Sequence, residues 1–260
     1  MSFVMLIISF LSSVIGAVCG IGGGVIIKPV LDAFDILPVV SISFLSSCTV
    51  LSMSMCTLIR NIVAKNIQID FSVTPYLSAG AAAGGIIGKR IFELACRHLE
   101  NTEKVGGYQA ICILILTLGT LLYTIFKNRI NEKKNNSKIF SVLIGLALGI
   151  ASSFLGIGGG PFNLAVLYYF YSMKTKEAAQ NSLFIILISQ ITSFVTTLIT
   201  GSIPDISIIT LMLMAGGGII GGLVGVKLNN KLSDSNVHVL FIVLMIVIIG
   251  INCANIYRFL

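Results

Sequence analysis

The chain consists almost entirely of long apolar runs separated by short polar stretches. Eight runs of about 18 residues or more contain no Asp, Glu, Lys or Arg, at residues 1–27, 40–59, 71–88, 105–126, 139–173, 178–204, 206–226 and 237–257. An apolar run of about 20 residues is long enough to cross the hydrocarbon core of a bilayer as a helix. The pattern predicts an all-α polytopic membrane protein.

Two of these runs are interrupted by the same pentapeptide, Gly-Ile-Gly-Gly-Gly, at residues 20–24 and 156–160. Each glycine costs about 1 kcal/mol relative to alanine inside a helix, so three in succession break it. A break at membrane depth exposes backbone groups that must line a cavity or meet a ligand. Breaks at corresponding positions of two halves are typical of the binding site of a transporter.

The breaks belong to a longer internal repeat. The second pentapeptide lies 136 residues after the first, and the pattern Gly-x₃-Gly-Gly-x₂-Gly occurs at 80–88 and again, 137 residues later, at 217–225. Two patterns that agree in order and offset indicate duplication. We interpret the chain as a first transmembrane repeat at 1–130, a polar linker at 131–138 and a second repeat at 139–260.

Each repeat is predicted to contain five helical segments. We expect them at 3–19, 25–35, 40–60, 70–90, 107–126, 139–155, 161–172, 178–200, 205–227 and 237–257. The second segment of each repeat spans only about 17 Å as a helix, roughly half of the hydrocarbon core. We therefore expect each glycine break to join the two arms of a hairpin that enters the membrane and returns at its midplane.

The distribution of Lys and Arg favours an inverted arrangement of the two repeats. Returning hairpins give each repeat an odd number of crossings, which places eleven loop cations on one side and five on the other. If each broken pair were a single crossing, the same cations would divide eight and eight. The positive-inside rule favours the uneven distribution. It predicts inverted repeats with both termini outside, although four outer cations in 89–104 do not follow the rule.

Composition supports this class of protein and excludes others. Hydrophobic residues make up 56% of the chain and charged residues 10%, whereas soluble domains contain about 25% charged residues. The six cysteines show no metal-ligand spacing, so we expect neither a metal nor a cofactor. The first segment lacks the positive region of a signal peptide and has a counterpart in the second repeat, so we expect no cleavage.

Helix starts beside the two breaks are candidates for binding an anion. Free backbone N–H groups and the helix dipole attract negative charge at a helix N-terminus, and Pro161 favours a helix start. The candidate backbone cradle consists of Gly22, Gly23, Gly24, Gly158, Gly159 and Gly160. Alternatively, the glycines only allow helices to pack closely.

Lys28 is the cation nearest a break, four residues after Gly24. A charge inside the membrane indicates function, although a lysine on a short helix can also extend to the surface. Its counterpart in the second repeat is Leu164, and the neighbouring Asn163 could contribute hydrogen bonds from that side. We therefore expect an asymmetric site with contacts from both repeats.

Uncharged polar residues on the third segment of each repeat complete the candidate site. Ser46 and Ser182 occupy equivalent positions, and Asn181 lies beside the second of them. Their side chains could orient an oxyanion, or they could only form hydrogen bonds between helices. We expect the glycine row at 80–88 and its repeat to serve helix packing.

Other functions lack the residues that they need. No Asp or Glu lies in the middle of a predicted crossing, with Asp32 near a segment end, so a buried proton relay has no obvious carrier. No paired nucleophile and base, facing carboxylates or metal cluster is apparent, so we do not expect an enzyme. Val25 and Pro161 replace the last glycine of a dinucleotide-binding pattern, which argues against nucleotide binding.

The duplicated pentapeptide, the polar-rich helix after it and the later glycine row resemble the TauE/SafE family of sulfite exporters over nearly the whole chain. The resemblance implies a secondary transporter, with export the expected direction, of small sulfur-containing anions such as sulfite, thiosulfate or organosulfonates across the cytoplasmic membrane. The chain departs from the expected pattern at Lys28, where an apolar residue would precede Pro29. A channel-like facilitator of small anions is the alternative, and the expected partners are the anion and the lipid bilayer, without nucleic acid.

Overall fold

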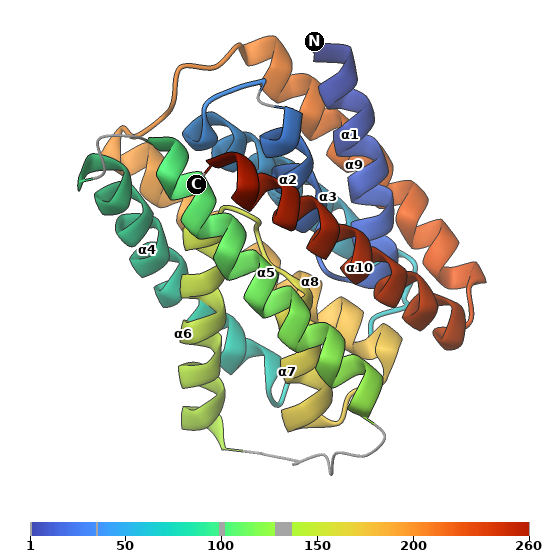
Figure 1. The fold of residues 1–260 in the computed structure, drawn as a ribbon. Helices are drawn as coiled ribbons and strands as arrows, with labels where there is room; N and C mark the ends of the chain where they lie inside the picture. Colours follow the sequence, from blue (N-terminus) through green and yellow to red (C-terminus); the bar gives the residue numbers. More distant parts are fainter. Residues whose placement is uncertain (1, 35, 99–101, 128–136, 260) are drawn as a thin grey trace.

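The computed structural model describes residues 2–34, 36–98, 102–127 and 137–259, which form ten α-helices and no strand (Figure 1). The predicted first repeat contains α1 (Ser2–Cys19), α2 (Gly24–Phe34), α3 (Val39–Val63), α4 (Thr74–His98) and α5 (Thr102–Phe126). The second contains α6 (Lys138–Leu155), α7 (Pro161–Tyr171), α8 (Thr175–Thr200), α9 (Ile208–Lys231) and α10 (Asp234–Phe259). Of the predicted linker, residues 131–136 lie outside the described residues.

The ten helices lie where the apolar runs predict them, and the all-α membrane fold is confirmed. The largest difference is in α4, which was expected at 70–90 but begins at Thr74 and continues to His98. The expected end at residue 90 coincides with the charged pair Lys89 and Arg90. Charges do not interrupt backbone hydrogen bonding, and residues 91–98 contain no glycine or proline to stop the helix.

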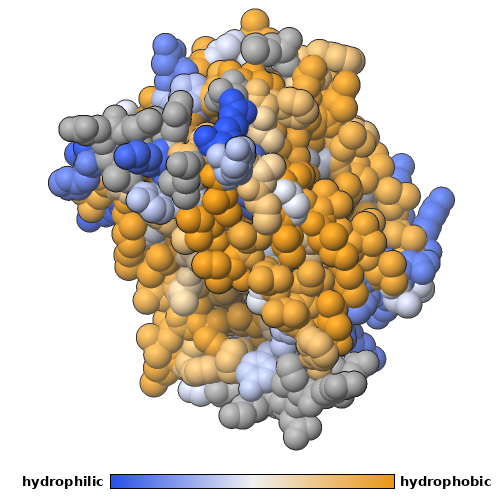
Figure 2. Space-filling view, viewed as in Figure 1, coloured by the Kyte–Doolittle hydropathy of each residue, from blue (hydrophilic) through white to orange (hydrophobic). Residues whose placement is uncertain are grey.

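Seven of the described helices are long and apolar enough to cross a membrane, namely α1, α3, α5, α6, α8, α9 and α10. Apolar side chains cover most of the face seen in Figure 2, and hydrophilic residues gather toward its upper left and right. Large exposed hydrophobic residues include Ile115 and Leu122 of α5 and Val243 and Ile246 of α10. A surface of this kind requires lipid, which makes the chain a multi-pass membrane protein.

The two repeats exchange their packing partners in a reciprocal way. The first helix of each repeat packs along the fourth helix of the other, giving the pairs α1 with α9 and α6 with α4. The second helix of each repeat likewise contacts the fifth of the other, in the pairs α2 with α10 and α7 with α5. Figure 1 shows α1 and α6 starting from opposite ends of the molecule, with α2 and α7 turning back toward those ends.

The glycine rows allow the closest of these contacts. A Cβ atom added at Gly80, Gly84 or Gly88 of α4 would approach the carbonyl oxygens of Val142, Leu146 or Ile150 of α6 closer than 3.0 Å. The repeated row of α9 meets the backbone of α1 in the same way. Without side chains at these positions, the helix backbones come into direct contact, as small residues permit in membrane helix pairs.

Replacing Gly84 with alanine is expected to lower the free energy of unfolding by about 1–3 kcal/mol, because the new methyl group would force α4 away from α6. Thermal unfolding in detergent measures this change. Alanine at Gly119 is the matched control, since no heavy atom lies within 4 Å of a Cβ built there. Equal melting temperatures for the two variants would contradict close backbone contact between α4 and α6.

Candidate functional site

The two glycine breaks touch each other inside the protein. A Cβ atom added at Gly24, the first residue of α2, would approach the carbonyl oxygen of Ile157 in the second break closer than 3.0 Å. Gly158 in turn lies against the side chain of Val50, which belongs to α3 of the first repeat. Residues at 21, 25 and 157 are almost completely buried. The breaks therefore form one buried junction built from both repeats.

Gly22 and Gly158, which are equivalent positions of the two breaks, have the same backbone conformation. The φ angle is 74° at Gly22 and 71° at Gly158, in the left-handed region that only glycine adopts readily. Both breaks end one helix and start another, at Gly24 and at Pro161. The first backbone N–H groups of α2 lie at the junction and lack an intrahelical partner. In α7, Pro161 has no N–H and the N–H of Asn163 donates to the carbonyl oxygen of Gly160, so the N–H of Phe162 is the first one available there.

Three of the expected side chains near the junction are buried and unpaired. Ser46 and Ser182 have no exposed surface, and Asn163 is 2% exposed. Their Oγ and Oδ1 atoms have no hydrogen-bond partner among the described residues. A buried polar atom without a partner costs about 1–3 kcal/mol, so such atoms mark places where a ligand or water can bind.

Asn163 contributes to a small polar pocket beside the second break. The pocket is closely packed, and Ser152 of α6, Asn163 of α7 and Ser189 of α8 are its polar lining residues. The hydroxyl groups of both serines also lack partners within the described residues. Three different helices thus present hydrogen-bonding groups to one space next to the start of α7.

Lys28 does not reach the surface of the protein. Its side chain is fully buried and its Nζ donates to Oδ2 of Asp32 at 2.9 Å, while Asp32 is 4% exposed. The second carboxylate oxygen, Oδ1, has no partner in the described part of the chain. The alternative interpretation, in which Lys28 extends to the surface, is therefore wrong. Asp32 compensates the charge of Lys28 inside the protein. Asp32 also supplies the buried carboxylate that was not expected from its place near the helix end.

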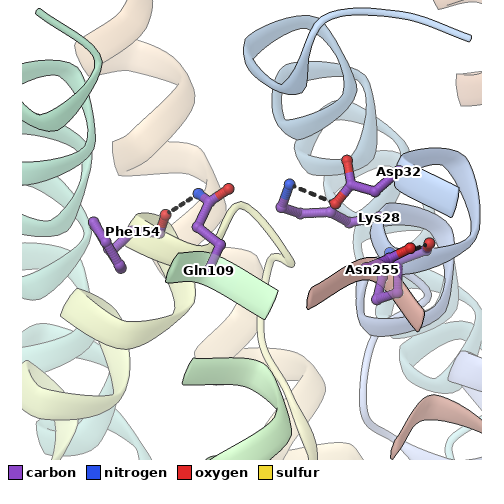
Figure 3. Close-up of polar contacts among 6 residues, drawn as sticks. Lys28, Asp32, Gln109, Phe154 and Asn255 are labelled. Carbon is purple, nitrogen blue, oxygen red and sulfur yellow. Dashed lines mark hydrogen bonds and ion pairs between the residues drawn. The ribbon is translucent and has the colours of Figure 1, made fainter. Parts of the chain in front are cut away.

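Two buried amides near this ion pair were missed by the sequence analysis. Gln109 of α5 and the ammonium group of Lys28 point toward one another in Figure 3. The Nε2 atom of Gln109 donates to the carbonyl oxygen of Phe154 at 2.6 Å, and Asn255 of α10 donates to the carbonyl oxygen of Pro29 at 2.9 Å. Both carbonyl groups lie in helices that flank a break. An amide inside a charge-free apolar run is the sequence signal for both.

The side chain of Asn181 binds the chain segment that precedes α4. Both of its amide atoms have partners away from the junction. Its Oδ1 accepts hydrogen bonds from the backbone N–H of Asp70 and from the hydroxyl of Thr74, and its Nδ2 donates to the carbonyl oxygens of Gln68 and Glu177. With the side-chain amide fully engaged, the geometry gives Asn181 a part in holding the α3–α4 connection.

The expected residues thus fall into two groups. The glycines, Ser46, Asn163 and Ser182 gather at or beside the junction, and Lys28 lies one helical turn into α2. Asn181 lies on the same helix as Ser182 but faces the 66–74 segment. In the described part of the chain, no group of His, Cys, Asp and Glu residues could hold a metal ion.

Comparison with known proteins agrees with this geometry. Residues 5–252 match the family described as Sulfite exporter TauE/SafE. The chain is 24% identical to the probable membrane transporter protein YunE of Bacillus subtilis (strain 168), over 99% of this chain and 98% of that protein. It is 28% identical to a probable membrane transporter protein of Haemophilus influenzae (strain KW20 Rd), over 68% of this chain and 65% of that protein. No solved structure matches the chain significantly.

The family match covers both repeats, both glycine breaks and all the helices that form the junction. The relatives carry names of membrane transporters and not of enzymes. This chain belongs to the TauE/SafE family of sulfite exporters.

Proposed function

We propose that this protein is a secondary transporter that exports a small sulfur-containing anion, such as sulfite, thiosulfate or an organosulfonate, across the cytoplasmic membrane. The observation that carries the proposal is the junction, where two helix starts and unpaired buried hydroxyl and amide groups converge from both repeats. Helix N-termini and neutral donors bind oxyanions without needing a fixed positive charge.

The anion is held mainly by backbone groups in this proposal. Residues 22–24 and 158–160 form the cradle, and three helices supply donors, the hydroxyl groups of Ser46 and Ser182 and the Nδ2 amide group of Asn163. Asn181 supports the site indirectly by holding the segment before α4. Neutral donors of this kind suit a carrier, because a site that binds too tightly cannot release its substrate.

Lys28 takes part in anion binding by exchanging its partner Asp32 for the transported anion. In the resting protein Asp32 neutralises Lys28, so the ion pair adds no net charge to the site. An arriving anion competes with the Asp32 carboxylate for the Lys28 ammonium group. This competition makes anion binding depend on how easily the pair separates, and it links occupancy of the site to a movement of α2.

Alternating access follows from an inverted arrangement of the two repeats, with the hairpins α1–α2 and α6–α7 entering from opposite sides of the membrane. The reciprocal helix pairs support this part of the proposal, since each hairpin packs on helices of the other repeat. Rocking of one repeat against the other would then open the junction to each side in turn.

Purified protein in proteoliposomes is expected to take up radiolabelled sulfite, thiosulfate or a sulfonate with saturable kinetics, and neither chloride nor acetate. Replacing Gly159 with valine should abolish uptake, because φ is 135° there and a Cβ would collide with Ile186. Valine at the exposed Gly119 of α5 is the control and should leave uptake unchanged.

Three other results would each contradict one part of the proposal. Uptake of none of the sulfur anions would overturn the substrate class. Unchanged uptake by the Gly159 variant would remove the second break from the site. Single-channel current in a planar bilayer would replace the carrier with a channel-like facilitator, since an open pore conducts and an alternating carrier does not.

A further inference from the structure

Two further pockets flank the junction, and each is lined by residues of both repeats. The first, which we name the Lys89 pocket, leaves about 20 Å³ of free space, and its polar lining is formed by Ser43, Ser47, Lys89, Ser153, Ser193 and Thr197. The second, the Thr57 pocket, also leaves about 20 Å³, and its polar lining is formed by Thr57, Asn61, Lys176, Gln180, Asn229 and Asn230.

The two pockets occupy equivalent positions under the internal repeat. Thr57 and Asn61 of the second pocket correspond to Ser193 and Thr197 of the first at the offset of 136. The first pocket reaches Gly156 of the second glycine break. The second includes Ala179, which is the residue that a Cβ at position 20 of the first break would meet. Each break therefore has one polar pocket beside it.

The Lys89 pocket has the chemistry of an oxyanion site. Lys89 is 8% exposed, and in the described part of the chain its ammonium group has no hydrogen-bond or ion-pair partner. The ring of Phe92 holds it at 5.5 Å from the ring centroid. Ser43 and Ser153 are 5% and 6% exposed, and their hydroxyl groups also lack partners among the described residues. An ammonium group on a largely buried side chain, with free hydroxyl donors beside it, favours a small anion as the missing partner.

No carboxylate among the described residues lines this pocket. Glu93, one turn further along α4, is close enough for its charge to act on Lys89 but is not in contact with the ammonium group. Lys28, by contrast, already pairs with Asp32. Of these two lysines, Lys89 is the one without a carboxylate partner among the described residues, so its charge is available to a ligand. An uncompensated charge inside a membrane protein is costly and indicates a function.

We propose that the Lys89 pocket is a second anion site, in which the transported sulfur oxyanion binds before or after it occupies the junction. This inference rests on the proposed function for the identity of the anion. At the equivalent position of the Thr57 pocket, Val226 replaces Lys89, and the cation of that pocket is the more exposed Lys176 of α8. The two pockets therefore differ in the burial of their charge and in strength. In an inverted arrangement they open toward opposite sides of the membrane, and the Lys89 pocket captures anions on its own side more strongly.

The first test compares transport kinetics in proteoliposomes. Lys89→Met is expected to raise KM for the transported sulfur anion at least tenfold, and Lys89→Arg to keep KM within about threefold, because the charge is what the pocket contributes. Arg90→Met is the matched control, since Arg90 is the exposed neighbour on α4 and carries the same charge. Unchanged KM in Lys89→Met beside a transporting wild type would overturn the second site and leave the proposed function intact.

The second test reports on the pocket without transport. Cys48 lines the Lys89 pocket and is buried, whereas Cys253 is exposed on α10. Slow alkylation of Cys48 by the small reagent iodoacetamide is therefore followed over hours by mass spectrometry in the purified full-length protein, with Cys253 as the exposed reference. Methanesulfonate should slow alkylation of Cys48 and leave Cys253 unaffected. The protection should disappear in Lys89→Met, or in Ser43→Ala combined with Ser153→Ala if the lysine variant does not fold.

The two readouts separate the failure of the site from the failure of the proposed function. Protection of Cys48 in a protein that transports no sulfur anion would keep the second site and overturn the proposed function. Absence of protection in the wild type would overturn the second site whatever the transport assay shows. Equal protection by phosphate and acetate would overturn the sulfur-oxyanion assignment of this pocket.

Discussion

Gly24→Ala is expected to reduce transport at least a hundredfold and to lower the melting temperature more than alanine at a glycine with open surroundings. The added methyl group would meet the carbonyl oxygen and carbon of Ile157 closer than 3.0 Å. Those atoms belong to the backbone of the other break, which has no rotamer to change. Overpacking of this kind costs about 1–3 kcal/mol even where the backbone can move, and here relief requires the two breaks to separate.

Alanine at Gly250 is the control for this variant. Gly250 lies in the interior of α10 and no heavy atom lies within 4 Å of a Cβ built there. The change should leave transport intact and add up to about 1 kcal/mol of stability through helix propensity. Transport is measured in proteoliposomes and stability by thermal unfolding. Normal transport by Gly24→Ala would show that the contact between the breaks is not needed for function.

Lys28→Met is expected to destabilise the protein by about 3–5 kcal/mol, because Asp32 would be left as a buried carboxylate without a partner. The double variant Lys28→Met with Asp32→Leu removes both charges and should recover most of that stability, since hydrophobic residues often replace a buried ion pair without loss. Unfolding in detergent measures both changes. A Lys28→Met protein as stable as the wild type would contradict a buried, charged pair.

The double variant also separates stability from function. If Lys28 contacts the anion, the stable double variant should still show a KM raised at least tenfold for the sulfur anion. Recovery of both stability and KM would assign the pair to folding alone and remove Lys28 from the site. Asp32→Asn is a third variant in which KM is compared. It keeps the charge of Lys28 and removes the carboxylate that competes with the anion.

Helix positions could be predicted from the sequence because lipid imposes a simple rule on this chain. Apolar runs without charge had to become helices that satisfy their own backbone groups, and three glycines in succession had to interrupt them. The predicted end of α4 at residue 90 was wrong, because the helix continues past the charged pair Lys89 and Arg90 to His98. Lys89 instead turns inward against Phe92, which places its charge in a pocket inside the protein.

The side-chain partners of the site could not be predicted in the same way. Asp32 lies one turn from Lys28 on the same helix, so an ion pair between them was open to sequence reasoning. The contacts of Gln109 with α6 and of Asn181 with the segment before α4 join residues 45 and more than 100 positions apart. Only the folded arrangement brings such positions together.

The reciprocal pairing of the helices also bears on how such a chain originated. Neither repeat contains the partner of its own first helix, because α1 packs on α9 and α6 packs on α4. A shorter ancestral protein that encoded a single repeat would have exposed its glycine row and one unpaired hairpin. Two identical copies could have covered these surfaces by docking around a twofold axis, with the same patch contributed by each. Gene fusion would then have turned a subunit interface into the interior of one chain, after which Lys28 and Lys89 could arise in one half alone.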